Sequence, residues 1–183
     1  MIIPEEGSLL LVNKPKSWTS FDVVNKLRYL LKIKKIGHAG TLDPLAKGLL
    51  LIGIGKYTKK LESLQGLDKT YEGIIEIGKT TPSFDLETPF DSSSDYMHVT
   101  PQQIAVAVEA LTGELDQIPP IYSAIKVNGQ RAYKSARKNE IIELKSRKIQ
   151  VYKFEITQVH LPEIHFRVVC SKGTYIRSLA KDL

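Results

Sequence analysis

The stretch SRKIQVYKFEITQVHLPEIHFRVVCS, residues 146–171, contains the pattern that decides the fold class. Apolar and polar side chains alternate in both halves of the stretch, and Pro162 separates the two halves. An alternation with a period of two residues is typical of strands that bury one face and expose the other. The stretch therefore predicts two antiparallel strands that are joined near Pro162.

Outward from these strands, the rest of the chain shows strand and helix patterns in mixed order. Apolar runs predict strands at residues 8–12, 49–54 and 69–78. Helical spacing or capping predicts helices at residues 19–32, 56–66, 100–113 and 173–183. Thr100 and Gln103 form a capping box at the start of one helix, and Thr19 or Ser20 caps another.

Two further segments complete the expected fold. Asn128-Gly129 lies between two extended segments, which indicates a β-hairpin, and the polar residues 79–95 predict a mobile loop. Strands dominate the second half of the chain. We therefore expect an α+β fold with a largely antiparallel mixed sheet flanked by helices, rather than a doubly wound fold.

The positive charge of the chain is concentrated in one stretch. Residues 126–153 hold nine basic and two acidic side chains, an excess larger than the net charge of +6 of the whole chain. Such a local excess indicates a polyanionic partner, and nucleic acid is the usual one. The alternative is a solvated, lysine-rich face with no partner.

Cysteine and hydropathy patterns limit the other possibilities. Cys170 is the single cysteine of the chain, which excludes an internal disulfide and a zinc site built from several cysteines. It also fits a reducing, cytoplasmic location. No apolar run approaches the roughly 20 residues that span a membrane, so we expect no membrane partner.

One acidic residue stands out in the stretch GHAGTLDPLAKG, residues 37–48. Asp43 lies between Leu42 and Pro44, and proline disfavours the helical conformation for the residue before it. Asp43 then either caps a short helix that begins at Pro44 or holds a reactive carboxylate at a turn. The nearby glycines leave room for another backbone or a ligand.

Aromatic and basic side chains suggest further functional positions. Tyr71 lies in a predicted strand, where it is either a platform for a stacked base or a core residue. Tyr175 and Arg177 lie two residues apart at a helix start. Either both side chains reach one cleft, or Tyr175 is a buried core residue and Arg177 lies on the surface. Basic residues interleave with Tyr122 and Tyr133 around the predicted hairpin, which suits RNA.

Taken together and in this order, the motifs resemble the TruB-type tRNA pseudouridine synthases, which are related to dyskerin. The matching blocks are LLVNKPKSWTSFDVV, GHAGTLDPLAKGLLLIGIGKYTK, DKTYEGIIEIGKTTPSFD, QIPPIYSAIKVNGQRAYKSARK, SRKIQVYKFEI and CSKGTYIRSLAKDL. The resemblance implies the pseudouridine synthase fold, with an active-site cleft across the sheet. It also implies isomerisation of uridine to pseudouridine in the T-loop of tRNA, at U55.

The resemblance assigns roles to single residues. Asp43 is similar to the nucleophile of the family, and Arg177 to its salt-bridge partner. Tyr71 corresponds to the residue that stacks on the flipped base. Tyr175 corresponds to a second catalytic pocket residue and a candidate for proton transfer at carbon 5. His38 corresponds to the residue that contacts the loop from which the base has left.

Two lysines and the expected partners complete the implied site. Lys14 and Pro15 match a block that supports the catalytic loop, and Lys126 begins the basic segment that would lie on RNA backbone. The reaction involves no hydride, phosphoryl or redox step, so no cofactor and no metal are expected. The implied partner is the T-arm of tRNA, and we expect a cytoplasmic monomer.

The chain also departs from the family pattern. Ala39 and Lys47 replace the usual residues on either side of Asp43, and a usual glycine after Asp85 is missing. The family continues beyond the last predicted helix and commonly adds a PUA domain. We therefore expect residues 1–183 to be the catalytic domain, incomplete at its C-terminus and without a PUA domain.

Two other functions compete with the enzyme. A non-catalytic module that binds or folds tRNA would use the basic stretch and Tyr71, and Asp43 would then be only a cap. A hydrolase or phosphatase with an aspartate nucleophile is disfavoured, because the next acidic residue after Asp43 is Glu62.

Overall fold

A computed structural model describes residues 4–123, 125–127, 130–132 and 144–183. The chain divides into two compact units, Met1–Leu67 and Asp68–Leu183. Each unit has its own antiparallel sheet and its own apolar cluster. Within the described residues, no helix is long and apolar enough to cross a membrane.

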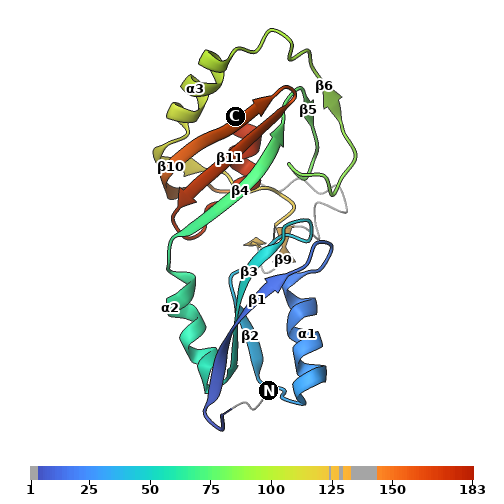
Figure 1. Ribbon diagram of the computed structural model, residues 1–183, viewed down its shortest axis with the longest axis vertical. Coiled ribbons are helices and arrows are strands. Elements are labelled where there is room, and N and C mark those ends of the chain that lie inside the picture. Colours follow the sequence, from blue (N-terminus) through green and yellow to red (C-terminus); the bar gives the residue numbers. More distant parts are fainter. Residues whose placement is uncertain (1–3, 124, 128–129, 133–143) are drawn as a thin grey trace. The chain divides into compact units, whose positions relative to one another are not determined.

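The first unit is a three-stranded sheet with a helix on each face (Figure 1). Its strands are β1 (Gly7–Lys14), β2 (Ile36–Ala39) and β3 (Gly48–Gly55), in the order β1-β3-β2. Helix α1 (Ser20–Leu31) covers one face. The buried side chains of this layer are Val23, Val24, Ile36, Leu50, Ile52 and Ile54.

Local sequence explains the two helical segments of this unit. Thr19 caps α1 and forms a capping box with Asp22, which decides between the two predicted caps. A 3-10 turn, η1 (Lys56–Lys60), leads into α2 (Leu61–Gln65). Leu61 packs on the second face of the sheet, where a Cβ atom on Gly53 would lie only 3.0 Å from its side chain.

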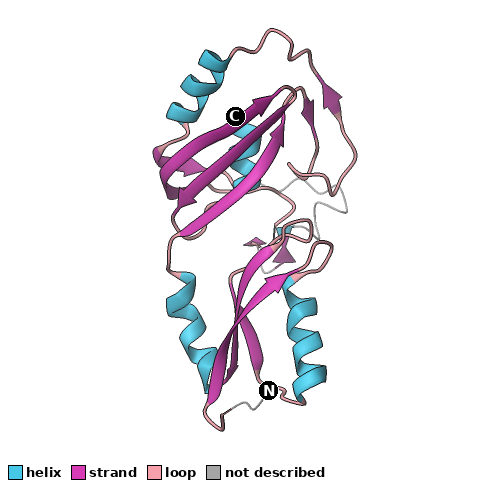
Figure 2. Ribbon diagram, in the orientation of Figure 1, coloured by secondary structure: helices cyan, strands magenta, loops and turns pink. Residues whose placement is uncertain are grey.

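The second unit contains the strands that the opening stretch predicted (Figure 2). Its sheet has the order β4-β11-β10-β7. The strands are β4 (Lys69–Glu76), β7 (Gly113–Gln117), β10 (Arg147–His160) and β11 (Glu163–Cys170). Every pairing in this sheet is antiparallel, so the α+β prediction is confirmed.

Two helices bury one face of this sheet. Helix α3 (Pro101–Ala110) begins at the predicted Thr100–Gln103 capping box, and α5 (Ile176–Asp182) follows β11. The alternate residues of β11 form the centre of the cluster because they point to the same face. The buried members are Ile75, Ile104, Val108, Ile149, Val151, Phe154, Ile164, Phe166, Val168, Cys170 and Leu179.

The structure differs from the sequence-based expectation in three segments. Residues 79–95, expected as a mobile loop, contain the paired strands β5 (Lys79–Thr80) and β6 (Ser92–Ser93). Ser83 in this loop is completely buried. Strands β2 and β7 were not expected, because β2 has only four residues and β7 contains Glu114 and Asp116 among its five.

The predicted hairpin is present as far as the structure describes it. Strand β8 (Lys126–Val127) pairs with β9 (Gln130–Arg131) in antiparallel register. Asn128-Gly129 and Tyr133 lie outside the described residues, as does most of the basic segment up to residue 143. The prediction that residues 1–183 form one catalytic domain stays a prediction.

Candidate active site

Asp43 lies at a tight turn in the first unit. The amide of Ala46 donates to the carbonyl oxygen of Asp43 at 3.0 Å, and Pro44 occupies the second position of the turn, which its fixed φ angle favours. The chain then enters β3 at Gly48 instead of continuing as a helix. The turn prediction is therefore confirmed, and the short helix that Asp43 would have capped is wrong.

Hydrogen bonds to neighbouring segments hold this turn from both sides. The hydroxyl of Ser20 accepts from the amide of Leu42 at 3.0 Å, and the amide of Ser17 donates to the carbonyl oxygen of Pro44 at 2.8 Å. Ser20 is almost completely buried. The residues before and after Asp43 are thus anchored to the start of α1, which limits the motion of the carboxylate between them.

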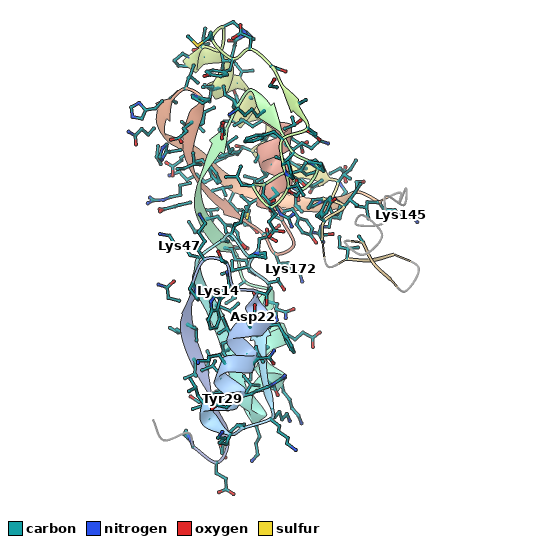
Figure 3. All side chains as sticks on the ribbon, turned by 90° about the vertical axis from the view of Figure 1, so that its right-hand side faces the viewer. Lys14, Asp22, Tyr29, Lys47, Lys145 and Lys172 are labelled. Atoms are coloured by element: carbon teal, nitrogen blue, oxygen red, sulfur yellow. The ribbon has the colours of Figure 1, made fainter. Side chains whose placement is uncertain are left out.

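Lys14 is the second anchor of the turn. Its side chain is fully buried, and Nζ donates to the carbonyl oxygens of Trp18 at 2.6 Å, Pro15 at 3.0 Å and Pro44 at 3.2 Å. Burial lowers the pKa of Lys14, while the negative charge of Asp43 raises it. Figure 3 shows Lys14 near Asp22 at the start of α1, with Tyr29 further along the helix.

His38 lies in β2 on the face of the sheet that α1 covers. It pairs with Ile52 of β3, whose side chain is buried under α1, and direct cross-strand partners share a face. The His38 side chain is half-buried, and its Nδ1 lies within hydrogen-bond distance of the carbonyl oxygen of Gly40. The first unit therefore places Lys14 within electrostatic range of Asp43, and His38 in the strand that precedes the Asp43 turn.

Arg177 is held by three groups in the second unit. Its guanidinium donates to the carbonyl oxygens of Ser83 and Tyr122, both at 3.0 Å. Its Nε lies 3.6 Å from Oδ2 of Asp85, and both side chains are largely buried. The predicted alternative of a surface arginine is therefore wrong, because the first turn of α5 directs this side chain inward.

The loop that holds Arg177 is itself organised around Asp85. Oδ1 of Asp85 accepts from the hydroxyl of Ser83 at 2.6 Å and from the amide of Glu87 at 2.9 Å. The hydroxyl of Thr81 donates to the carbonyl oxygen of Asp85 at 2.6 Å. From the sequence, Asp85 stood out only for the glycine that is missing after it, and neither Ser83 nor Asp85 was expected in the site.

Tyr175 is bound through both its backbone and its ring. The side-chain amide of Gln117 accepts from the Tyr175 amide at 2.7 Å and donates to the Tyr175 carbonyl oxygen at 3.0 Å. The Arg147 guanidinium lies 4.4 Å from the centre of the Tyr175 ring. Both partners lie in blocks that match the family, but nothing in the local sequence indicated that they contact Tyr175.

Tyr71 lies on the helix-covered face of the second sheet. It is half-buried in β4, opposite the fully buried Val168, and it packs against the apolar cluster. This is the face to which Ile176 of α5 also contributes. Tyr71 is thus in part a core residue, which was one of the two predicted roles. Stacking of Tyr71 on a base stays a prediction.

Several basic side chains of residues 126–153 already have partners within the protein. Lys148 forms an ion pair with Glu114, Lys153 forms one with Glu155, and Arg147 lies on the Tyr175 ring. The backbone of Lys126 lies in β8. Contact of this segment with RNA stays a prediction, as does the ion pair of Asp43 in the first unit with Arg177 in the second.

Comparisons with known proteins agree with this combination of fold and residues. Residues 28–176 match the family described as TruB family pseudouridylate synthase (N terminal domain). The proteins named tRNA pseudouridine synthase B from Flavobacterium johnsoniae and Phocaeicola vulgatus are 57% and 49% identical to this chain. The alignments cover 97% and 98% of this chain and 80% and 79% of those proteins.

A solved structure shows the same fold. A chain in the crystal structure of a Cbf5-Nop10-Gar1 complex superimposes with a TM-score of 0.71 at 28% sequence identity. The superposition covers 96% of this chain and 43% of that chain, so this chain spans less than half of that protein.

The fold and the matches define one class of enzyme, the pseudouridine synthases, which are isomerases. Within that class, the chain belongs to the TruB family of pseudouridylate synthases. The family match includes His38, Asp43 and Tyr71, and it ends one residue before Arg177. The α+β pseudouridine synthase fold expected from the sequence is confirmed.

Proposed function

We propose that this chain isomerises uridine to pseudouridine in tRNA, with Asp43 as the nucleophile. The family match over residues 28–176 supports the activity, since relatives at 57% and 49% identity are named tRNA pseudouridine synthase B. The turn around Asp43 supports the nucleophile, because the turn is anchored through Leu42 and Pro44 on either side of the carboxylate.

In this reaction the N-glycosidic bond of uridine breaks, the base turns, and a carbon–carbon bond forms between C5 and the ribose. The hydrogen on C5 leaves as a proton, and N1, released from the ribose, takes up a proton, so the product is an isomer of the substrate. Asp43 acts as a carboxylate, and the cation of Lys14 favours that ionised form. In the proposed complete site, Arg177 adds a second positive charge beside the nucleophile.

The target base must leave its stack before Asp43 reaches it. Flipping a base out of a folded loop costs about a few kcal/mol. Stacking on Tyr71 would offset this cost by about 1–3 kcal/mol. His38 would contact the loop that the base has left, and Tyr175 would lie at C5 for the proton transfer. These assignments follow the family resemblance and are part of the proposal.

The finer parts of the proposal concern the substrate and the state of the protein. The substrate region is the T-arm of tRNA, with U55 as the target, and Lys126 contacts its backbone. The protein acts as a cytoplasmic monomer, and residues 1–183 form its catalytic domain. Primer-extension mapping of the modified position tests the target, and light scattering of the purified protein tests the monomer.

Release of tritium from tRNA labelled at C5 of uridine tests the activity directly. We expect the chain to release tritium and Asp43→Asn to abolish the release while tRNA binding persists. A chain that binds tRNA without turnover would instead support the non-catalytic RNA-binding module. Unchanged turnover by Asp43→Asn would refute the assigned nucleophile.

A further inference from the structure

Tyr175 is held by two residues for which the proposed reaction gives no role. Gln117 ends β7, Arg147 begins β10, and the two are direct partners across these strands. Both side chains contact Tyr175, which precedes α5 and lies 58 positions beyond Gln117 in the chain. One pair of strand residues thus contacts a single tyrosine through its backbone and its ring.

The two bonds of Gln117 fix the direction of its side-chain amide. Oε1 accepts from the Tyr175 amide at 2.7 Å, and Nε2 donates to the Tyr175 carbonyl oxygen at 3.0 Å. A reversed amide would place a donor against a donor and an acceptor against an acceptor. Gln117 is only 3% exposed, so the buried amide has little access to water as an alternative partner.

The bonds from Gln117 hold the residue at which helix α5 begins. Its N-cap residue is Tyr175 in an extended conformation, and no side-chain cap bond from that residue is present. The adjoining segment adds two contacts: Ser178 donates to the carbonyl oxygen of Ile118 at 2.8 Å, and Arg177 donates to that of Tyr122. Residues 117–122 therefore orient the whole first turn of α5.

The ring of Tyr175 has a separate partner. The Arg147 guanidinium lies 4.4 Å from the ring centre, within the range of a cation–π contact. A planar guanidinium can stack on an aromatic ring in a way that an ammonium group cannot. Gln117 restrains the backbone of Tyr175, and Arg147 restrains the direction of its ring.

From this geometry we propose that Gln117 and Arg147 are positioning residues that orient Tyr175, and through the first turn of α5 also Arg177, for the isomerisation. The inference rests on the proposed function. Neither residue needs to touch the substrate. Displacement of a reacting group by about 1 Å can cost about 100-fold in rate, so the restraint affects turnover more than binding.

Substitutions at Gln117 test the backbone part of the proposal. Gln117→Glu keeps the shape and the acceptor but loses the donor to the Tyr175 carbonyl oxygen, and Gln117→Ala loses both bonds. Gln103→Ala is the matched control, because Gln103 also bonds a helix N-terminus in this unit, that of α3, through its side-chain amide. All variants are compared under conditions where each is folded.

We expect Gln117→Glu and Gln117→Ala to lower kcat about 10- to 100-fold with KM for tRNA unchanged, and Gln103→Ala to leave kcat unchanged. A kcat equal to that of the control, or a change in KM alone, would overturn the positioning role. Wild-type turnover is measured first, so a failure of the proposed function is distinguished from a failure of this inference.

Hydrogen exchange of the Tyr175 amide gives a readout independent of activity. The amide bonds to Oε1 of Gln117, so Gln117→Ala should accelerate its exchange, while Gln103→Ala should not. Unchanged exchange in Gln117→Ala would contradict the restraint even in a chain without turnover.

A matched pair of charge substitutions tests the ring contact. Arg147→Met and Lys148→Met each remove one positive charge from adjacent positions of β10, but only Arg147 lies on the Tyr175 ring. We expect Arg147→Met to lower kcat, whereas Lys148→Met, which belongs to the same basic segment, should affect only KM for tRNA and its salt dependence. Equal effects of both substitutions on KM and on salt dependence alone would show a general RNA contact and overturn the role of Arg147.

Discussion

Replacement of Lys14 by methionine should destabilise the first unit far more than loss of an ordinary lysine. The Nζ atom donates to the carbonyl oxygens of Pro15, Trp18 and Pro44, and the side chain is fully buried. Methionine has a similar volume, so the substitution leaves little cavity but removes all three donors. The change therefore isolates the hydrogen bonds of one ammonium group.

The geometry sets the size of the effect. Pro44 keeps a second donor, the amide of Ser17 at 2.8 Å, so the loss falls mainly on the carbonyl groups of Pro15 and Trp18. A hydrogen bond from a charged donor contributes about 1.5–3 kcal/mol. Methionine also removes the cost of burying a charge, which offsets part of this loss. We expect the free energy of unfolding to fall by about 2–4 kcal/mol.

Urea unfolding followed by tryptophan fluorescence measures this change. Trp18 is the single tryptophan of the chain, so the signal reports on the first unit. Lys16→Met is the control, since Lys16 is exposed and only two residues away, and it should shift the free energy by at most about 0.5 kcal/mol. A difference below about 1 kcal/mol between the two variants would refute the assigned role of the Lys14 bonds.

Four further predictions concern both units. Asp85→Asn removes the charge beside Arg177 and should lower the free energy of unfolding by about 3 kcal/mol and reduce tritium release; a fully active, equally stable variant would contradict the pair. Gly53→Ala should cost about 1–3 kcal/mol in thermal unfolding, because its Cβ would lie 2.9 Å from the carbonyl oxygen of Tyr57 and 3.0 Å from the side chain of Leu61, and wild-type stability would show that residues 57–61 move away freely. Burial raises the pKa of Cys170 above its ordinary value of 9.0, so the folded state keeps a proton that the unfolded state loses, and the free energy of unfolding should fall as pH rises above about 9. The Cys170 thiol should react with a thiol reagent only as the protein unfolds, and fast labelling of folded protein would contradict its burial.

Much of the fold was predictable because its elements depend on neighbouring residues. The alternation in residues 146–171 predicted β10 and β11, and the capping box at Thr100 predicted the start of α3. Strand β7 was missed, since its charged residues form no apolar run and its pairing partner lies about 30 residues away in β10. Pairing over such a distance is a tertiary effect that propensity does not contain.

The candidate site was likewise predictable from the sequence only in part. Asp43 was singled out from the Asp-Pro dipeptide and its glycines, and the turn at that position is present. The predicted helix after Pro44 is absent, because the chain returns at once to pair β3 with β1. Arg177 was expected from a motif, but its contact with Asp85 depends on a loop that sequence analysis expected to be mobile.

The sequence by itself determined the α+β class, the main strands and helix caps, and the residues that match the TruB family. These features depend on periodicity, capping and residue order along the chain. Only the tertiary structure decided which buried polar groups meet: Lys14 with Pro44 across 30 positions, and Gln117 with Tyr175 across 58. An unpaired buried polar group is costly, so burial favours pairing, and the fold determines which partner is within reach.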